Sequence, residues 1–425
     1  MNESNKIIFH IDVNSAFLSW TAAYRLKVLG EETDLRNIPS AICGSTETRH
    51  GIILAKSGPA KAYGIKTGEP LYLAKRKCPQ LVTAPPDYAL YTEASRKFIE
   101  LLKELAPVVE QYSIDEAWAD MTGTEKLYGP PVLAAEKIKD RIREQLGFTV
   151  NIGISCNKLL AKMASEFEKP DKVHTLFPDE IAVKLWPLPV GELFMVGRAS
   201  CRKLQSMGIA TIGQLAAADP RQLKLHLHKQ GEMIWNFANG RWDQQVSDDV
   251  SLNKGYGNSL TTSRNVCDTD KAKTIILSLC ETLAMRIRRD NQLCSCVSLH
   301  IRKDDFSSIS QQKQLSRPTD ATMEIYHAAC RILDLLWDGH TPLRQIGVYL
   351  SKVEQNCGRQ ISLFSTDNYE QLAKTDKAID SIRARFGEEA IMRACFLQAE
   401  VSPMSGGLSK QRRTGITKIT DPPSD

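Results

Sequence analysis

Two short apolar segments that carry carboxylates constrain the fold of this chain more than any other feature. The first is residues 9–13, FHIDV, and the second is residues 113–117, SIDEA. They lie too far apart in the sequence for one local loop, so we expect two strands that meet in the fold. Neighbouring residues of a regular strand face opposite ways. Asp115 and Glu116 can therefore serve one site only if the backbone bends at that corner.

Carboxylates gathered at a strand junction predict a site for a hard divalent cation. Mg²⁺ takes carboxylate oxygens and leaves the rest of its shell to water and substrate phosphates. Asp12, Asp115 and Glu116 together supply the ligands that two-metal phosphoryl transfer requires. The alternative is a surface turn with two acids, because Asp-Glu pairs are common on protein surfaces.

A third segment favours the metal site over the surface turn. Residues 153–165 read GISCNKLLAKMAS and run on to Lys169-Pro170. In this order and at these distances, the three segments resemble the motifs of the Y-family (translesion) DNA polymerases, of the bacterial polymerase IV or polymerase V catalytic subunit type. The family's second motif is Ser-Ile-Asp-Glu-Ala followed by an aromatic residue and Asp, here Trp118 and Asp120, and its third motif ends in Lys-Pro. The resemblance extends over most of the chain.

Composition sets looser bounds on the class of protein. The chain has 425 residues, of which 42% are hydrophobic and 25% charged, as in an ordinary globular protein of several domains. No apolar run approaches the ~18 to 20 residues that a membrane span needs, and no basic region followed by an apolar run indicates a signal peptide. The 11 cysteines show no metal-binding spacing and fit a reducing, cytoplasmic setting. The net charge of +5 is compatible with nucleic-acid binding but too small to establish it.

The alternation of strands and helices around the acidic segments predicts an α/β (α+β) multidomain protein. Short helices follow, and then strand-like runs separated by two amphipathic helices at about 271–289 and 320–336. The family resemblance implies a right-hand polymerase with these parts: palm at 1–23 and 88–178, fingers at 24–87, thumb with a helix-hairpin-helix at 179–246, little finger at 251–354, and clamp-binding peptide and C-terminal helix at 355–397. The end of the chain is rich in Ser, Gly, Pro, Lys and Arg, so we expect a disordered tail at 398–425.

The expected roles of the acids follow from two-metal chemistry. Asp12 and Asp115 should bridge two Mg²⁺ ions, and Glu116 should complete the metal that activates the primer 3′-hydroxyl. The resemblance implies that the backbone carbonyl of Val13 adds a ligand. Lys61 and Lys169 are candidates to neutralise the triphosphate as compact positive charges.

Phe17 follows Asp12 by five residues. Its position matches the family's steric gate, an aromatic ring that collides with a ribose 2′-hydroxyl and so selects deoxynucleotides. The alternative is a core Phe on the first helix, and both descriptions can hold for the same residue.

Several residues depart from the family's pattern. Many members grip the triphosphate with a Tyr and an Arg three residues apart, where this chain has Gly58 and Lys61, and a Thr that commonly precedes them is Ala55. The hairpin of the thumb usually reads Gly-x-Gly, and here it contains Gly197 and Ala199. Turn N–H groups and a helix N-terminus hold a DNA phosphate at such a hairpin, so the missing Gly predicts a looser grip.

Residues 360–364 resemble the peptide with which bacterial proteins bind the sliding clamp. The five residues of this segment are Gln360, Ile361, Ser362, Leu363 and Phe364. Such an extended segment inserts aliphatic and aromatic side chains into a pocket of its partner. The alternative is a strand end that packs on the core.

We therefore expect a monomeric, low-fidelity DNA polymerase that takes primed template DNA and dNTPs, copies damaged DNA and is tethered by the sliding clamp. The alternative is a catalytically impaired scaffold bound to the clamp. The presence of Asp12, Asp115 and Glu116 argues against the scaffold, whereas the altered triphosphate grip leaves it open. Another palm-type enzyme, such as a nucleotide cyclase, would explain the acids but not the hairpin or the clamp peptide.

Overall fold

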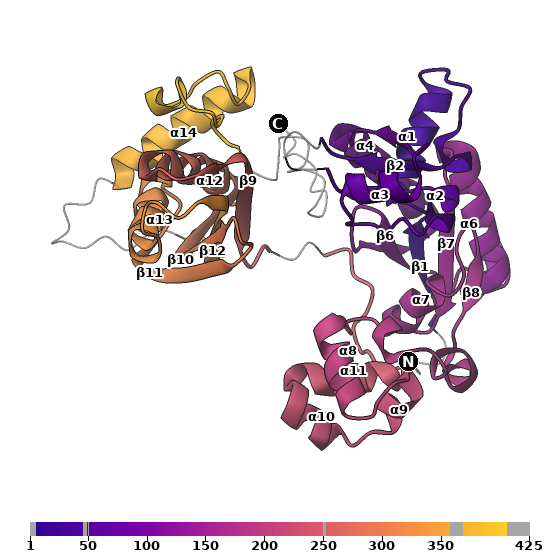
Figure 1. The fold of residues 1–425 in the computed structure, drawn as a ribbon. Coiled ribbons are helices and arrows are strands. Elements are labelled where there is room, and N and C mark those ends of the chain that lie inside the picture. The colour runs from indigo at the N-terminus through magenta and orange to yellow at the C-terminus, as the bar shows by residue number, and fades with distance from the viewer. Residues whose placement is uncertain (1–5, 46–48, 50, 250–251, 358–368, 406–425) are drawn as a thin grey trace. The chain divides into compact units, whose positions relative to one another are not determined.

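The structure is a computed structural model that describes residues 6–45, 49, 51–249, 252–357 and 369–405. These residues form two compact units (Figure 1). The first unit holds residues 6–44 and 52–249, and the second holds 45, 49, 51, 252–357 and 369–405. Within the described ranges, no helix is long and apolar enough to cross a membrane.

A five-stranded mixed sheet forms the centre of the first unit, with the strand order β5-β6-β1-β7-β8. Strand β1 lies in the middle and is antiparallel to both β6 and β7, while β7 and β8 are parallel. The strands are β1 (Ile8–Val13), β5 (Val108–Gln111), β6 (Glu116–Asp120), β7 (Val150–Ser155) and β8 (Val173–Thr175).

The alternation of side chains along β1 divides the sheet into two faces. Phe9, Ile11 and Val13 lie in a large hydrophobic core with residues of α4 (Tyr88–Leu105) and α6 (Pro131–Leu146). Ile8, His10 and Asp12 point the other way, towards α7 (Lys158–Ser165), where Ile8 packs with Trp118 and Ala161. Helix α1 (Ala16–Lys27) follows β1 and adds Trp20 to the large core.

A smaller sheet of three strands, with the order β3-β2-β4, lies between α1 and α4 in the sequence. Its strands are β2 (Ser40–Cys43), β3 (Ile53–Lys56) and β4 (Val82–Ala84). Helices α2 (Gly58–Ala62) and α3 (Leu71–Lys77) pack on it through a small core that includes Ala60, Ile65 and Ala74.

Residues after β8 form a helical region with its own core. Short turns of helix at Pro178–Glu180, Ile181–Leu185 and Val190–Glu192 precede α8 (Arg198–Ser206), α9 (Ile212–Ala217), α10 (Pro220–Leu227) and α11 (Lys229–Ala238). The same core includes Leu159, Leu160 and Met163 of α7. The helical region therefore packs on the helix that covers the Asp12 face of the five-stranded sheet.

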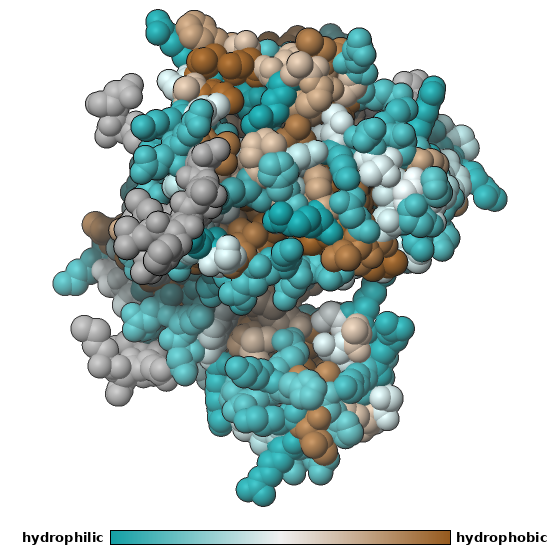
Figure 2. Space-filling view, turned by 90° about the vertical axis from the view of Figure 1, so that its left-hand side faces the viewer, coloured by the Kyte–Doolittle hydropathy of each residue, from teal (hydrophilic) through white to brown (hydrophobic). Residues whose placement is uncertain are grey.

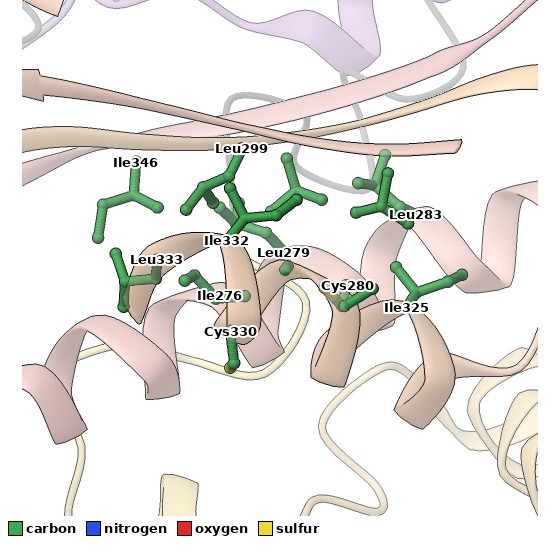
Figure 3. Close-up of a cluster of buried hydrophobic side chains, with 14 of the residues drawn as sticks. Ile276, Leu279, Cys280, Leu283, Leu299, Ile325, Cys330, Ile332, Leu333 and Ile346 are labelled. Carbon is green, nitrogen blue, oxygen red and sulfur yellow. The ribbon is translucent and has the colours of Figure 1, made fainter. Parts of the chain in front are cut away.

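The second unit consists of a four-stranded antiparallel sheet with the order β11-β10-β12-β9. Two helices, α12 (Thr269–Arg289) and α13 (Thr322–Leu336), cover one face of it. Figure 3 shows side chains such as Leu299 and Ile346 of the sheet facing Ile276 and Leu333 of the helices. The strands are β9 (Tyr256–Val266), β10 (Gln292–Lys303), β11 (Ser308–Thr319) and β12 (Leu343–Gln355).

Helix α14 (Tyr369–Phe386) is fixed to the second unit by buried ion pairs. Arg383 pairs with the nearly inaccessible Glu281 at 2.7 Å, and Arg288 pairs with Asp376 and Asp380. The helix ends at Phe386 and is followed by Gly387, whose φ of 102° is one that residues with a side chain rarely adopt. One turn of 3-10 helix lies further on, at Ala394–Phe396.

The disorder expected from residue 398 onward is wrong for residues 398–405. Met404 is buried, and the Ser405 amide donates a hydrogen bond of 2.8 Å to the Ser278 hydroxyl. The contact with α12 orders a segment whose composition alone suggested disorder. Residues 406–425 lie outside the described residues, as does the candidate clamp peptide at 360–364.

Hydrophilic side chains dominate the face drawn in Figure 2, with small hydrophobic areas between them. The most exposed large apolar residues belong to different parts of the chain and are Leu127, Val183, Leu335 and Leu397. Scattered apolar side chains of this kind are normal on a globular protein and require no partner to explain them.

The close packing of β7 against α7 gives a prediction about stability. A Cβ at Gly153 would lie 2.0 Å from the Ala161 carbonyl oxygen and 2.4 Å from the Ser165 nitrogen. Both are backbone atoms, so Gly153→Ala should destabilise the first unit by about 2 kcal/mol or more. A Cβ at Gly58 would meet no atom within 4 Å, so Gly58→Ala is the matched control. Urea unfolding followed by circular dichroism measures both, and equal stabilities would contradict the packing.

Candidate active site

The antiparallel register of β1 and β6 brings the first and second acidic segments together. Asp12 is the register partner of Glu116, and His10 is the partner of Trp118. Because paired residues of neighbouring strands share a face, Asp12 and Glu116 both face α7, away from the large core. Asp12 is 6% exposed, and its place at the end of β1 leaves its carboxylate at the rim of the sheet.

Asp115 joins this pair because the backbone bends just before β6. The Tyr112 and Ser113 amides both donate to the Glu116 carbonyl, at 3.0 and 3.2 Å, which closes a tight turn. The Val13 amide donates to the Asp115 carbonyl at 3.0 Å, so this turn is tied to the end of β1. The bend that a shared site of Asp115 and Glu116 requires is therefore present at the Ser-Ile-Asp-Glu corner.

Two lysines supply positive charge to the acids. Lys169 pairs with Asp12 and, at 2.9 Å, with Glu166. Lys162, on α7, pairs with Glu116 Oε2, and its ammonium group lies 5.0 Å from the Tyr112 ring centroid and 5.4 Å from that of Phe194. The sequence analysis included Lys169 and missed Lys162.

Burial and these partners set the protonation of the acids differently. Burial raises the pKa of Asp12 to about 7 although Lys169 opposes it. Burial likewise raises the pKa of Asp115, against the Ser113 hydroxyl that donates to Asp115 Oδ1 at 2.6 Å. Burial would also raise the pKa of Glu116, but His10 and Lys162 outweigh it and lower that pKa to about 2.

Burial and neighbouring charges also shift the pKa values of the basic residues Lys169 and His10. Burial would lower the pKa of Lys169, but Asp12 and Glu166 outweigh it and raise that pKa. His10 is fully buried, and burial lowers its pKa to about 4 despite the neighbouring Glu116.

The carboxylate oxygens of the three acids are ligands of the kind that a hard cation such as Mg²⁺ prefers. Their present positions, however, do not yet form a metal site. Among the residues that the structure describes, no three His, Cys, Asp or Glu side chains converge as a ready metal site. Lys169 and Lys162 hold the carboxylates of Asp12 and Glu116 instead. Glu116 Oε1 accepts no hydrogen bond from the described residues. A divalent cation suits carboxylates whose pKa is raised by burial, as in Asp12 and Asp115, because its charge would stabilise their ionised form.

Phe17 lies at the start of α1 and is half-buried. Its ring stacks on Tyr91 with a centroid distance of 4.4 Å and an interplanar angle of 5°, and it meets Tyr88 edge to face. It also packs against the large core. The core contact given as the alternative for Phe17 is therefore present, and because the residue is only partly buried the steric gate stays a prediction.

Lys61 is exposed on α2, apart from the acids' hydrogen-bond network. Lys56, at the end of β3, donates to the Thr67 hydroxyl at 3.2 Å, and burial together with Lys61 lowers the pKa of Lys56. Ala55 is buried, whereas the space beside Gly58 is open. Of the positions where the family pattern has Tyr, Thr and Arg, only the last carries a polar side chain, Lys61, and Lys56 beside Ala55 adds a second ammonium group.

Gly197 is the N-cap of α8, and Ala199 lies in the first turn of that helix. No side chain caps this helix N-terminus, so its first N–H groups have no side-chain acceptor. The predicted loop-to-helix geometry is present at the two hairpin residues.

A buried cluster of cations and aromatic rings lies next to the acids, and the sequence analysis missed it. Lys158 bonds both carboxylate oxygens of Glu110 at 2.8 Å and lies 4.5 Å from the centroid of Trp118 and 5.3 Å from that of Trp242. The Ser247 amide also donates to Glu110. The available signal was the spacing of Lys158 and Lys162, which places both on one face of α7.

Comparison with known proteins agrees with this architecture. Residues 11–166 match a family model described as the impB/mucB/samB family, and residues 253–363 match its C-terminal domain. The chain is 46% identical to DNA polymerase IV of Clostridium acetobutylicum over 93% of this chain and 99% of that protein. It is 35% identical to DNA polymerase IV 2 of Bacillus subtilis, over 93% and 95% of the two chains. A solved Y-family DNA polymerase chimera has the same fold, with a TM-score of 0.69 at 23% identity over 82% of this chain and 100% of the other.

The chain belongs to the Y family of DNA polymerases. The family resemblance inferred from the three sequence motifs and the multidomain α/β fold class are both confirmed.

The buried pair of Lys158 and Glu110 generates a prediction. Lys158→Met leaves the Glu110 carboxylate largely buried without its cation, which should destabilise the first unit by about 3 kcal/mol. The double variant Lys158→Met with Glu110→Gln removes both charges and keeps an acceptor for Ser247, so it should regain at least half of that loss. Urea unfolding of the single and double variants measures the coupling. If the stability losses of Lys158→Met and Glu110→Gln, each measured alone, add up to the loss of the double variant, the two side chains do not stabilise the protein as a pair.

Proposed function

We propose that the protein is a DNA-directed DNA polymerase that inserts deoxynucleotides opposite damaged template, in error-prone translesion synthesis, by two-metal phosphoryl transfer. The observation that carries this proposal is the β1–β6 register, which sets Asp12 against Glu116 beside Asp115 in a member of the Y family. Primed template DNA and dNTPs are the substrates that the names of the relatives suggest.

Two Mg²⁺ ions would be held by Asp12, Asp115 and Glu116 with the Val13 carbonyl, and when bound they would supply an activated primer 3′-hydroxyl and a neutralised leaving group. Asp12 and Asp115 would reach both ions, and Glu116 the ion at the primer. The Ser113 hydroxyl orients Asp115. Lys169, paired with Asp12, is close enough to the acids to exchange that partner for a phosphate oxygen.

The remaining parts take the roles that the family implies. The five-stranded sheet and its helices would be the palm, the three-stranded sheet with Lys61 the fingers, and the helical region with Gly197 and Ala199 the thumb. The second unit would be the little finger, which holds the DNA backbone. Residues 360–364 would bind the sliding clamp, and the enzyme would act as a monomer in the cytoplasm.

A catalytically impaired scaffold on the clamp is the competing function, because Gly58 and Ala55 leave the triphosphate grip without its Tyr and Thr hydroxyls. Nucleotide insertion separates the two functions directly.

Removal of the acids gives the first test of catalysis. Asp115→Asn with Glu116→Gln should lower primer extension with dNTPs and Mg²⁺ by about a thousandfold or more, since electrostatic stabilisation of this size depends on charge. Glu125→Gln with Glu144→Gln removes two exposed acids of the same unit and should extend as the native protein does. Native protein that binds primed DNA and extends nothing, even with the clamp present, would favour the scaffold.

Phe17 provides a test of sugar selection. Phe17→Ala removes the ring that would meet a 2′-hydroxyl, so the ratio of rNTP to dNTP insertion should rise by about tenfold or more. Phe17→Leu retains bulk beside Tyr91 and should change the ratio less. Single-nucleotide insertion with each dNTP and rNTP measures the ratio, and an unchanged ratio in a folded Phe17→Ala protein would remove the steric-gate role.

A further inference from the structure

We propose that His10 is a positioning residue that fixes the Glu116 carboxylate by donating a hydrogen bond from Nε2, while the Ser165 hydroxyl donates to Nδ1. The inference deepens the proposed function and rests on it, because it concerns how one acid of the proposed site is held.

The position of His10 follows from the strand. It precedes Asp12 by two residues on β1 and therefore shares its face, and it is fully buried. Its ring is tilted against Trp118, with centroids 5.4 Å apart, and Nδ1 lies 2.8 Å from Ser165 Oγ. Packing and one hydrogen bond therefore fix the plane of the imidazole.

The other ring nitrogen faces an acid. His10 Nε2 lies 3.4 Å from Glu116 Oε2, which is near enough for an electrostatic contact, but in the present geometry it makes no hydrogen bond with the described residues. A buried ring nitrogen without a partner is destabilising. A bare lone pair directed at a carboxylate would add repulsion, whereas an N–H in the same place would be a charge-assisted donor.

One hydroxyl proton selects the tautomer. Ser165 Oγ lies 2.8 Å both from His10 Nδ1 and from the Lys162 carbonyl oxygen, and the hydroxyl can donate to one of them. If the Ser165 hydroxyl donates to the carbonyl, its oxygen can only accept from the ring, so Nδ1 must carry the ring proton. The lone pair of Nε2 then faces Glu116. If the hydroxyl donates to Nδ1, the ring proton sits on Nε2 and points to Glu116. The negative charge of Glu116 favours the second arrangement.

The two groups that reach Glu116 from within the protein converge on the same oxygen. Lys162 bonds Oε2 and His10 Nε2 faces the same oxygen, whereas no described residue donates a hydrogen bond to Oε1. Holding Oε2 with two donors fixes the rotation of the carboxylate and leaves Oε1 available as a ligand. Partners of this kind commonly set metal affinity at a site without touching the metal.

Amide substitutions separate the two ring nitrogens. His10→Gln can place an amide N–H near the position of Nε2, His10→Asn reaches only towards Ser165, and His10→Leu supplies neither group. We expect Mn²⁺ affinity of the metal-free protein, measured by calorimetry, to stay within about twofold in the Gln variant and to fall about tenfold or more in the Asn and Leu variants. The Mg²⁺ concentration for half-maximal primer extension should shift in the same order. Folded Asn and Gln variants with equal Mn²⁺ affinity would overturn the proposal.

A measurement on the native sequence tests the tautomer independently. In metal-free protein labelled with ¹⁵N-histidine, the His10 signals, identified among 8 histidines by their loss in His10→Gln or His10→Asn, should show a protonated Nε2 and a bare Nδ1. A protonated Nδ1, with Nε2 bare or also protonated, would overturn it. Neither this spectrum nor Mn²⁺ binding requires polymerase activity, so native protein that fails to extend primers would count against the proposed function alone.

Discussion

The pairing of β1 with β6 is the interaction on which the rest of the site depends. It matches Asp12 to Glu116 and His10 to Trp118, so the acids and their supporting residues share one face. The register is fixed from the other face, where Phe9, Ile11 and Val13 fill the large core. A slip of one residue would turn those apolar side chains towards α7 and Asp12 into the core. The hydrophobic core therefore determines where the charges stand.

Two buried lysines then join this sheet to the helical region. Lys158 lies between Trp118 and Trp242 and neutralises Glu110, and Lys162 lies near Tyr112 and Phe194 and neutralises Glu116. Trp242 and Phe194 come from the helical region, so the rings that enclose the lysines belong to both parts of the first unit. A low-polarity enclosure strengthens each ion pair but makes an unpaired charge costly. The packing of the helical region and the charge state of Glu116 are thus parts of one network.

Local pattern predicted the elements well where packing and propensity agree. The helices expected at about 271–289 and 320–336 are present as α12 and α13, whose ends differ from those bounds by no more than two residues. The two acidic segments, expected as strands that meet, lie on β1 and at the start of β6. His10, Lys158 and Lys162 were missed because their importance depends on which face they share with the acids, which only the register and α7 determine. The tail was misjudged for a related reason, because Met404 and Ser405 gain order from contact with a distant helix. The composition of a segment does not show whether another part of the protein packs against it, and it is this packing that orders residues 398–405.

The departures on the small sheet have a physical consequence of their own. Where the family pattern offers a hydroxyl and a forked guanidinium, this chain has open space beside Gly58 and two ammonium groups, Lys56 and Lys61. Burial and the neighbouring Lys61 lower the pKa of Lys56, and Glu69 opposes this shift without cancelling it. A bound triphosphate would relieve both the repulsion and the loss of solvation, and would thereby raise that pKa again. Under the proposed function, the charges of these lysines would bind the triphosphate where the family pattern uses directed hydrogen bonds. Two ammonium groups attract a triphosphate strongly but do little to fix its orientation. Under the proposed function, the nucleotide is therefore oriented mainly by the palm, where the strand register fixes the positions of the acids.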